Sequence, residues 1–382
     1  MKKNIWNMNY VCLMIVNTVT SFGFYMISSI LSKYLTNIGF DLTVAGVVVG
    51  TFSITSLLIR PVTGFLADEY NKKRLIVFAC ILMCAANFGY IITDHMAVIM
   101  ISRVIHGIGF GINSTALVSL VAKYIPEEKF GEGMGYFGLG MVLSSAVGPG
   151  IGIAVMNRIG IKYSFIVAGL TVFLGIILMA VMKCERGIQR RQHLRDVLKL
   201  KRLISFDVLN YTVISGVYSF INGIIASFLV LFAEDIGIKD VSIYFTVYAV
   251  VLFIIRPFAG KLLDRRGLSV IIYPAAILTI ISMFMLSQAT TLAAIVISGV
   301  IRAIGQGAAQ PSLQAAAIQK AGKERSGVAT STYYLGGDIG QGIGPVLGGV
   351  FAQFYGYSST FYVCIALLVA GGCVFFLSTR NK

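Results

Sequence analysis

Long stretches without a charged side chain limit what this chain can fold into. Asp, Glu, Lys and Arg are absent from five stretches, which cover residues 11–32, 75–93, 133–157, 163–182 and 208–233. Each is close to or above the roughly 20 residues that a helix needs to cross about 30 Å of hydrocarbon. Two further charge-free stretches, 270–301 and 339–379, are long enough for two crossings each. These lengths predict segments that span a membrane.

The composition agrees with this prediction. Only 12% of the residues are charged, 57% are hydrophobic and the mean hydropathy is +0.84, whereas a soluble domain carries about 25% charged residues. Hydrocarbon offers backbone groups no partners, so a spanning chain forms helices or a closed barrel. Continuous apolar runs favour helices. We predict an all-α integral membrane protein with twelve transmembrane helices, at residues 9–33, 42–66, 75–94, 97–122, 132–156, 162–183, 206–233, 241–262, 269–288, 291–318, 326–353 and 358–379.

The net charge of +15 comes mainly from one set of loops. Of the 31 Lys and Arg, 25 lie at the termini or in the loops after the even-numbered helices, helix ends included; the alternate loops hold Lys33, Arg158, Lys162 and Lys239. This asymmetry follows the positive-inside rule and predicts that both termini are cytoplasmic. It explains the basic charge without a nucleic-acid partner. The span after "MKKNIWNMNY" is too long for a cleavable signal, so we expect it to be the first helix.

No pattern typical of catalysis, metal binding or cofactor binding is present. The six cysteines lack the His or further Cys neighbours of a metal site, so apolar packing is their expected role. The three histidines form no set with Ser and Asp, and no phosphate-cradling Gly-Lys-Ser/Thr loop occurs. We therefore expect neither an enzyme nor a resident cofactor or metal ion. These residues are Cys12, Cys80, Cys84, Cys184, Cys364, Cys373, His95, His106 and His193.

One phrase occurs twice in the chain, as "IRPVTGFLADEYNKKR" from Ile59 and as "IRPFAGKLLDRRG" from Ile255. A constant offset of 196 residues relates matching positions at four separate places, which indicates a duplicated six-helix unit. The matches carry Arg60, Pro61, Gly64, Leu66 and Asp68 to Arg256, Pro257, Gly260, Leu262 and Asp264; Gly109 and Gly111 to Gly305 and Gly307; Glu128 and Lys129 to Glu324 and Arg325; and Gly148, Pro149 and Gly152 to Gly344, Pro345 and Gly348.

The duplication predicts the domain organisation. We expect an N-terminal six-helix bundle at 1–183, a cytoplasmic linker at 184–204 and a C-terminal six-helix bundle at 205–382. The linker is basic and is expected to meet anionic lipid, with a short surface helix as one form. Two bundles in the same orientation are parallel repeats about an axis along the membrane normal, and a central cavity between such halves suits alternating access.

These motifs resemble the signatures of the major facilitator superfamily of transporters, over essentially the whole chain. "GFLADEYNKKR" is similar to the family's loop between helices 2 and 3, and "SRVIHGIGFG" is similar to its Arg-then-Gly motif on helix 4. "GQGIGPVLGG" on the eleventh helix resembles the Gly-Pro motif of the drug–proton antiporter branch. On the fifth helix, "SAVGPGIG" departs from that motif at Ser144 and Ile153.

The resemblance implies a gating contact at the repeated loop. Asp68 ends the second helix, and the implied partner is the start of the eleventh helix, near Ser326–Thr330, where a carboxylate complements a helix N-terminus. Such a contact would latch the cytoplasmic side shut; a solvated cap that only signals orientation is the alternative. The residues of this candidate latch are Gly64, Asp68, Lys72, Lys73, Gly260, Asp264 and Arg265.

Two residues of the first loop depart from the family pattern. Glu69 stands where the family prefers Arg, and Asn71 stands where it prefers Gly. Because Asn tolerates a left-handed backbone better than other side-chain-bearing residues, we expect Asn71 to keep the turn in that conformation.

Polar and aromatic residues of the first, fourth, seventh and tenth helices are candidates for a substrate cavity, because the family lines its cavity with these helices. Polar groups at bilayer depth usually mark a pathway, although interhelical hydrogen bonding alone would explain them as well. The candidates are Asn17, Ser21, Phe24, Arg103, Phe110, Asn113, Tyr218, Asn222, Tyr248, Arg302, Gln306 and Gln310. Their mostly neutral and aromatic character suits a moderately apolar ligand, and the two arginines suit an anionic one.

Acidic residues are scarce inside the spans, and Asp338 is the one carboxylate well inside a helix. It is the first candidate for proton coupling, with a buried structural ion pair as the alternative. Arg103, Glu132 and His106 are the others. The small residues of the fifth and eleventh helices allow close helix packing, and a flexing or sealing interface is the alternative role. These are Gly148, Pro149, Gly152, Gly340, Gly344, Pro345 and Gly348.

Together these features predict a proton-coupled exporter of a small organic solute, a drug or a metabolite, that works as a monomer in a bacterial cell membrane. A facilitative or proton-symport importer of a sugar or organic acid shares every predicted fold feature. A membrane sensor that transports nothing is a third reading, which fits the two copies of the loop poorly.

Overall fold

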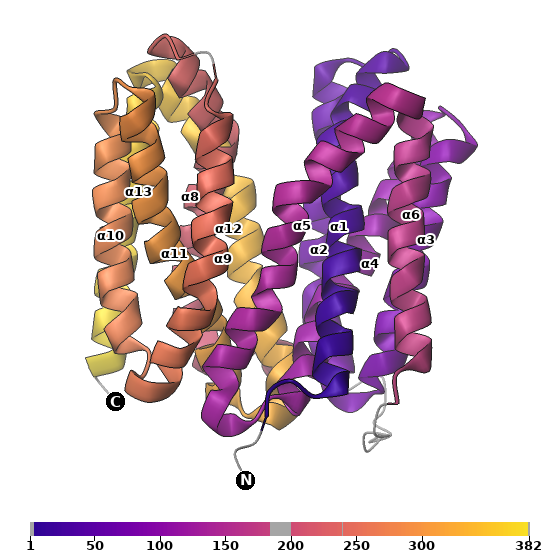
Figure 1. Cartoon of the computed structure of the whole chain (residues 1–382), viewed down its shortest axis with the longest axis horizontal. Helices are drawn as coiled ribbons and strands as arrows, with labels where there is room; N and C mark the ends of the chain where they lie inside the picture. The colour runs from indigo at the N-terminus through magenta and orange to yellow at the C-terminus, as the bar shows by residue number, and fades with distance from the viewer. Residues whose placement is uncertain (1–3, 184–199, 239, 381–382) are drawn as a thin grey trace. The chain divides into compact units, whose positions relative to one another are not determined.

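The computed structural model describes residues 4–183, 200–238 and 240–380, and within these ranges it contains helices and no strands (Figure 1). Twelve helices are long, and each begins and ends within about one helical turn of the predicted bounds. They are α1 (Met8–Asn37), α2 (Leu42–Glu69), α3 (Lys72–Ile92), α4 (Met96–Tyr124), α5 (Phe130–Ile159), α6 (Ile161–Val181), α8 (Leu209–Asp235), α9 (Ser242–Arg266), α10 (Ser269–Ser287), α11 (Leu292–Ala321), α12 (Ser326–Tyr355) and α13 (Tyr357–Arg380).

Eleven of these twelve helices in the described ranges are both long enough and apolar enough to cross a membrane. The exception is α12, which has sufficient length at 30 residues. Its many Gly, Ser, Thr and Gln residues lower its hydropathy compared with the other eleven. The architecture confirms the all-α membrane protein predicted from the charge-free runs.

Side chains that cap helix N-termini set several boundaries. Asn7, Asp41 and Thr291 each accept a hydrogen bond from a backbone N–H in the first turn of the helix that follows, which satisfies a donor that has no partner within the helix. Asn71 does the same for α3, with φ −68° and ψ 105°. The predicted left-handed conformation of Asn71 is therefore wrong: its side chain is more useful as a cap, which needs extended backbone.

The described residues form two compact units by contact. Unit 1 comprises the described parts of Met1–Pro126, Leu139–Ile204 and Lys323–Ser331; unit 2 comprises Glu127–Gly138, Ser205–Gly322 and Thr332–Lys382. Each unit thus takes one short segment from the other half of the sequence. Most of the predicted linker, 184–199, lies outside the described residues, and α7 (Leu200–Leu203) follows it.

Unit 1 is organised around α4. This helix packs against both α2 and α3, while α6 packs against α1 and α3. Its core includes side chains of α1, α3 and α6 such as Tyr34, Tyr90 and Phe165, all buried.

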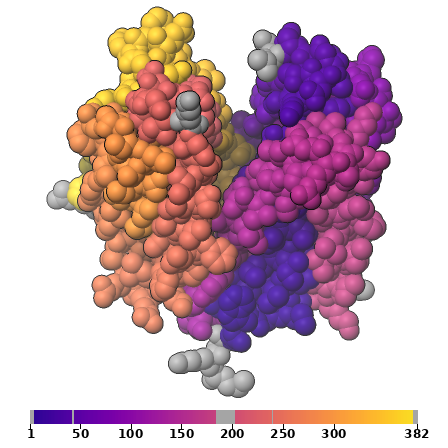
Figure 2. Space-filling model, turned by 45° about the horizontal axis from the view of Figure 1, so that its top comes forward, coloured from indigo at the N-terminus to yellow at the C-terminus, as the bar shows by residue number. Residues whose placement is uncertain are grey.

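Unit 2 repeats the pattern with α11 in the place of α4. Here α11 packs against α9 and α10, and α13 packs against α8 and α10. The core gathers buried residues of α8 and α13 such as Phe232 and Phe361. In the space-filling view the orange segment around α9 and α10 lies at the surface of this unit (Figure 2), and large apolar side chains such as Phe258 are exposed there, as expected for helices that face lipid.

Candidate functional site

Asp68 at the end of α2 binds the first turn of α12 within unit 1. One carboxylate oxygen, Oδ1, accepts the N–H of Gly327 at 2.7 Å and the other, Oδ2, accepts the N–H of Val328 at 2.9 Å. These two N–H groups belong to a helix N-terminus, where they have no partner within the helix and where the helix dipole favours negative charge. The side chain of Asp68 is only 10% exposed, and the Lys72 ammonium lies 3.6 Å away.

Asp264 at the end of α9 makes the equivalent contact within unit 2. Its carboxylate accepts the N–H of Gly131 at 2.6 Å and that of Glu132 at 2.9 Å, at the start of α5. Adding 196 to Gly131 and Glu132 gives Gly327 and Val328, so the two contacts are related by the repeat. We name these two sets of hydrogen bonds the Asp68 clamp and the Asp264 clamp.

Glycines make both clamps possible. A Cβ on Gly327 would collide with the carbonyl oxygen of Gly64, and a Cβ on Gly260 would collide with that of Gly131. Only glycine lets the two helices approach closely enough for the carboxylate to reach the N–H groups. The Gly and Asp of the loop motif therefore recur together because the carboxylate contact requires the close helix approach that glycine allows.

The basic residues of the two copies have different surroundings. Lys72 is buried and also donates to the Ser119 hydroxyl, which is 2.8 Å from that of Ser326. Lys73 instead donates to the carbonyl oxygens of Ala180 and Met182 at the end of α6. Lys73 thus caps a helix C-terminus and does not contact Asp68.

In the second copy, Arg265 is exposed and has no acidic partner among the described residues. The nearby Lys261 pairs with Glu132 at 3.4 Å. Glu132 is thus tied to the clamp region of unit 2 by its backbone and its side chain.

A hydrogen-bonded group surrounds Arg302 in unit 2. The guanidinium is 2% exposed, donates to the Tyr244 hydroxyl at 3.0 Å and to the Asn222 side-chain oxygen, and lies 4.6 Å from the centroid of the Tyr248 ring. The Tyr248 hydroxyl donates to Gln306 at 3.2 Å. We name these residues, with Tyr218 whose carbonyl accepts from Gln306, the Arg302 cluster. It brings together five predicted cavity residues.

An aromatic group occupies the related place in unit 1. Phe24, Phe52 and Phe110 pack together with ring centroids 4.6 to 5.2 Å apart, and His106 lies edge-on to Phe52 at 5.5 Å. Arg103 lies 4.5 Å above the Phe52 ring. We name these five residues the Arg103 cluster.

Sequence reasoning missed Phe52, Tyr90 and Tyr244. Phe52 and Tyr248 are 196 residues apart, as are His106 and Arg302. The offset that revealed the repeat would thus have added Phe52 to the candidates. No sequence signal distinguishes Tyr90 or Tyr244 from other buried tyrosines.

Other predicted cavity residues take part in packing between helices. Asn113 donates to Thr20 at 3.1 Å and accepts from the Cys80 thiol, so interhelical bonding accounts for its polar atoms. Asn17 lies beside Gly140 and Ser21 is buried. Gln310 accepts the Tyr333 hydroxyl with its backbone carbonyl at 2.8 Å.

Asp338 is half-buried on α12. Four glycines at spacings of four form the face of α12 that packs against α8. A Cβ on any of Gly336, Gly340, Gly344 and Gly348 would meet residues of α8. Asp338, two residues after Gly336, points away from that contact. The matching face of α5, with Gly148 and Gly152, lies on α1.

The two prolines of these motifs lie inside long helices. Pro149 is in α5 and Pro345 is in α12. Each removes one backbone hydrogen bond from its helix, and the ring of Pro345 would be 2.9 Å from a Cβ on Gly223 of α8. These segments are thus closely packed in the structure.

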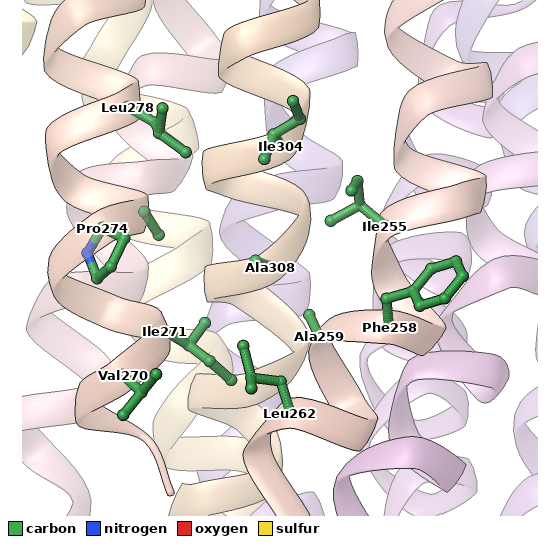
Figure 3. Close-up of a pocket in the computed structure, with 11 residues that line it drawn as sticks. Ile255, Phe258, Ala259, Leu262, Val270, Ile271, Pro274, Leu278, Ile304 and Ala308 are labelled. Atoms are coloured by element: carbon green, nitrogen blue, oxygen red, sulfur yellow. The ribbon is translucent and has the colours of Figure 1, made fainter. Parts of the chain in front are cut away.

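Unit 2 also has an apolar pocket of about 220 Å³ between α9, α10 and α11 (Figure 3). Ile255 and Phe258 of α9, Pro274 and Leu278 of α10, and Ile304 of α11 line it. No charged side chain lines this pocket. Its volume is below the roughly 300–1,000 Å³ typical of sites for drug-sized ligands, and its position between lipid-facing helices suits contact with hydrocarbon.

The fold and the two clamps define a class: a multi-pass membrane protein built from two repeated bundles, each with a carboxylate bound to a helix N-terminus. The sequence matches the family model of the Major Facilitator Superfamily over residues 13–343 and 211–382. The chain belongs to this superfamily, and it is a transporter rather than an enzyme.

Two relatives match over most of their length. An uncharacterized MFS-type transporter of Methanocaldococcus jannaschii is 26% identical over 380 residues, 97% of both chains. The multi-drug resistance efflux pump PmrA of Streptococcus pneumoniae is 26% identical over 354 residues, 87% of this chain and 84% of that one. The quinolone resistance protein NorA of Staphylococcus aureus is 28% identical over 160 residues, 42% of this chain and 41% of that one.

A solved structure has the same fold. The human organic anion transporter MFSD10 (TETRAN) superposes with a TM-score of 0.81 at 14% identity, covering 96% of this chain and 98% of that one. At this identity the likeness concerns the fold alone.

Proposed function

We propose that this transporter exports a small organic solute, a drug or a metabolite, in exchange for protons by alternating access. The observation that carries the proposal is the pair of clamps. Each one joins a carboxylate to the first turn of a helix that continues into the other unit, α12 for Asp68 and α5 for Asp264. Breaking and remaking these hydrogen bonds supplies a two-state element, which alternating access requires.

Export is supported by the relatives whose names describe efflux or drug resistance, PmrA and NorA. The aromatic side chains of the two clusters support a moderately apolar organic solute. Phe24 and Phe110 in unit 1 and Tyr248 in unit 2 are aromatic residues of these clusters that are only partly buried, and aromatic surfaces bind apolar ligands well.

For the coupling proton we propose Asp338. It is the one acid in the central part of any long helix, and the other helix acids lie within about one turn of a helix end. Its helix α12 carries both the Asp68 clamp and the Gly-Pro segment. A proton that binds Asp338 in one state and leaves it in the other would couple proton flow to the conformational cycle.

We further propose a monomer in a bacterial cell membrane, with both termini in the cytoplasm. The loop charges support this orientation. In it, 25 of the 31 Lys and Arg lie at the cytoplasmic face, where the positive-inside rule expects them. The predicted division at 1–183, 184–204 and 205–382 describes the duplication in the sequence, with the segments 127–138 and 323–331 packed in the opposite units.

The test measures solute flux in proteoliposomes with and without an imposed pH gradient, using a fluorescent cationic dye and a small carboxylic acid as probes. The wild-type protein should concentrate a probe when the gradient is present. Asp338→Asn should lose this accumulation but keep downhill exchange, because the amide resembles the protonated acid. Asp240→Asn, in the exposed loop between α8 and α9, serves as the matched control and should behave like the wild type. Accumulation by Asp338→Asn at the wild-type level would exclude Asp338 as the coupling site.

Import of an organic acid is a second candidate function, favoured by the two buried arginines Arg103 and Arg302. An importer would take up the carboxylic acid in right-side-out vesicles, and a facilitative one would do so at the same rate with and without the pH gradient. An exporter would show gradient-dependent uptake only in everted vesicles.

A further inference from the structure

Arg103 is buried with most of its hydrogen-bonding capacity unused. The residue is 2% exposed. One nitrogen, Nη2, donates to the carbonyl oxygen of Val49 at a long 3.3 Å, and the guanidinium lies over the Phe52 ring. Within the described part of the chain, Nε and Nη1 have no hydrogen-bond partner. Buried polar atoms of native proteins rarely lack one.

Neighbouring side chains share this deficit. The Tyr90 hydroxyl and both ring nitrogens of His106 are buried and unpartnered among the described residues. His106 follows Arg103 by one helical turn, and its ring centroid lies 6.3 Å from that of Tyr90. The Tyr90 hydroxyl lies near the Arg103 guanidinium, but the two groups do not have hydrogen-bond geometry. Asn87, one turn before Tyr90 on α3, and Ser56, one turn after Phe52 on α2, add further unpartnered atoms.

Within the described part of unit 1, no acidic residue forms an ion pair with Arg103. Seven long helices contribute to unit 1, and their membrane-crossing parts contain no Asp or Glu. These parts are residues 8–37, 42–67, 72–92, 96–124, 139–159, 161–181 and 326–331. Asp94 pairs with Tyr34 and Lys162, and it precedes α4, whose first residue, Met96, is seven residues, about 10 Å along the helix, before Arg103. Asp68 is occupied by its clamp. An unpaired buried charge is among the most unfavourable features a fold can have.

Arg302 in unit 2 has a smaller deficit of hydrogen-bond partners than Arg103. The same type of side chain, equally buried, finds hydroxyl and amide oxygens on Tyr244 and Asn222. Among the described residues, Arg302 thus donates to two side-chain acceptors and leaves only Nε unpartnered, whereas Arg103 donates to one backbone carbonyl and leaves Nε and Nη1 unpartnered.

We propose that Arg103, Tyr90 and His106 form a binding site for one monovalent anion inside unit 1. The ligand is a carboxylate group or a halide ion, and its negative charge balances the guanidinium. Arg103 offers the unpartnered Nη1–H groups as charged donors to the anion, while Tyr90 donates its O–H and His106 a ring N–H. The site is defined by unit 1 alone and does not rest on proton-coupled export.

The experiment measures the thermal unfolding of the purified full-length protein in detergent at constant ionic strength. Sodium chloride and sodium acetate are titrated separately against sodium isethionate, whose larger sulfonate serves as the reference anion. The site predicts a saturable rise in melting temperature. A response to chloride identifies a free inorganic anion as a ligand, and a response to acetate alone identifies a carboxylate, such as that of a transported acid.

Three variants localise the effect. Arg103→Gln should abolish the saturable rise, and Tyr90→Phe should raise the half-saturating concentration about tenfold, since it removes one hydrogen bond to a charged ligand. Arg158→Gln, an exposed arginine at the end of α5, is the control and should respond like the wild type. If Arg103→Gln does not fold, the Tyr90→Phe titration decides.

Two results would overturn the proposal. One is a wild-type melting temperature that shows no saturable difference between the three salts, which would mean that water alone fills the site. The other is a saturable rise that Arg103→Gln, or Tyr90→Phe in its place, leaves unchanged. Neither result depends on transport. The anion site can therefore be disproved while proton-coupled export stands, and proton-coupled export can be disproved while the anion site stands.

Discussion

The repeat relates three positions of unit 1 to three of unit 2, namely Phe52, His106 and Phe110 to Tyr248, Arg302 and Gln306. In unit 1 Phe52 contacts the other two through ring faces and edges, whereas in unit 2 Tyr248 contacts them through a cation–π interaction and a hydrogen bond. The three positions are related by the repeat, but their contacts are between rings in unit 1 and polar in unit 2. The comparison shows that the two repeats keep a side-chain cluster at the same positions but build it from residues of different chemistry.

The clamps show the opposite behaviour, because both copies keep the same chemistry. Asp68 and Asp264 each accept two backbone N–H groups at equivalent positions. They differ in charged neighbours: the buried Lys72 lies beside Asp68, whereas Glu132 lies beside Asp264. This difference predicts that the Asp68 clamp contributes more to transport than the Asp264 clamp.

The largest expected effect separates the two clamps. Asp68→Asn should slow transport about tenfold or more, because it weakens two hydrogen bonds to a charged acceptor and leaves the Lys72 ammonium buried without its carboxylate. Asp264→Asn should slow transport less, since no buried cation loses a partner. Initial solute flux in proteoliposomes, at matched amounts of folded protein, measures both. Equal flux in the two variants would contradict an unequal role.

The next largest expected effect is a difference in stability between variants of the two buried arginines. Arg302→Gln should lower the free energy of unfolding by about 2 kcal/mol, because Tyr244 and Asn222 lose a charged donor. Arg103→Gln should cause little or no loss in isethionate, since it removes a charge that has no acidic partner among the described residues. Thermal unfolding in detergent compares them. The same large loss in both variants would remove the contrast.

A double-mutant cycle would test whether the Arg103 cluster can take the polar contact of the Arg302 cluster. Phe110→Gln should destabilise unit 1, because it places an amide beside the Phe52 ring. Adding Phe52→Tyr should recover about 1 kcal/mol, because the new hydroxyl can donate to that amide as Tyr248 does to Gln306. Unfolding of the two single variants and the double variant gives the coupling energy. Additive effects would show that the two backbones do not place these side chains alike.

The smallest expected effect concerns the two loop turns. Asn71 caps α3 in extended backbone, whereas the equivalent Gly267 has φ +79°. Asn71→Gly should cost only a few tenths of a kcal/mol, since Gly is itself an acceptable cap. Gly267→Ala should cost about 1 kcal/mol through left-handed strain. Melting temperatures of the two variants test the order, and a larger loss for Asn71→Gly would reverse it.

Much of the fold was predictable because the signals are local. Charge-free runs located the helices, and N-cap residues such as Asp41 and Thr291 set where helices begin, near the predicted bounds. The offset of 196 residues was readable because duplication leaves motifs in register. Asn71 was predicted wrongly because sequence alone does not show whether an Asn side chain serves a turn or a cap.

The sequence by itself determined an all-helical membrane protein with two six-helix repeats, and it placed Asp68 near the start of α12 by resemblance. Only the tertiary structure decided which donors and acceptors meet. It assigned Lys72 to Asp68 and Lys73 to the end of α6, and it gave Arg302 partners that Arg103 lacks. The physical reason is range: apolar length and helix caps act within a few residues, whereas these contacts join residues up to 260 positions apart and depend on how the helices pack.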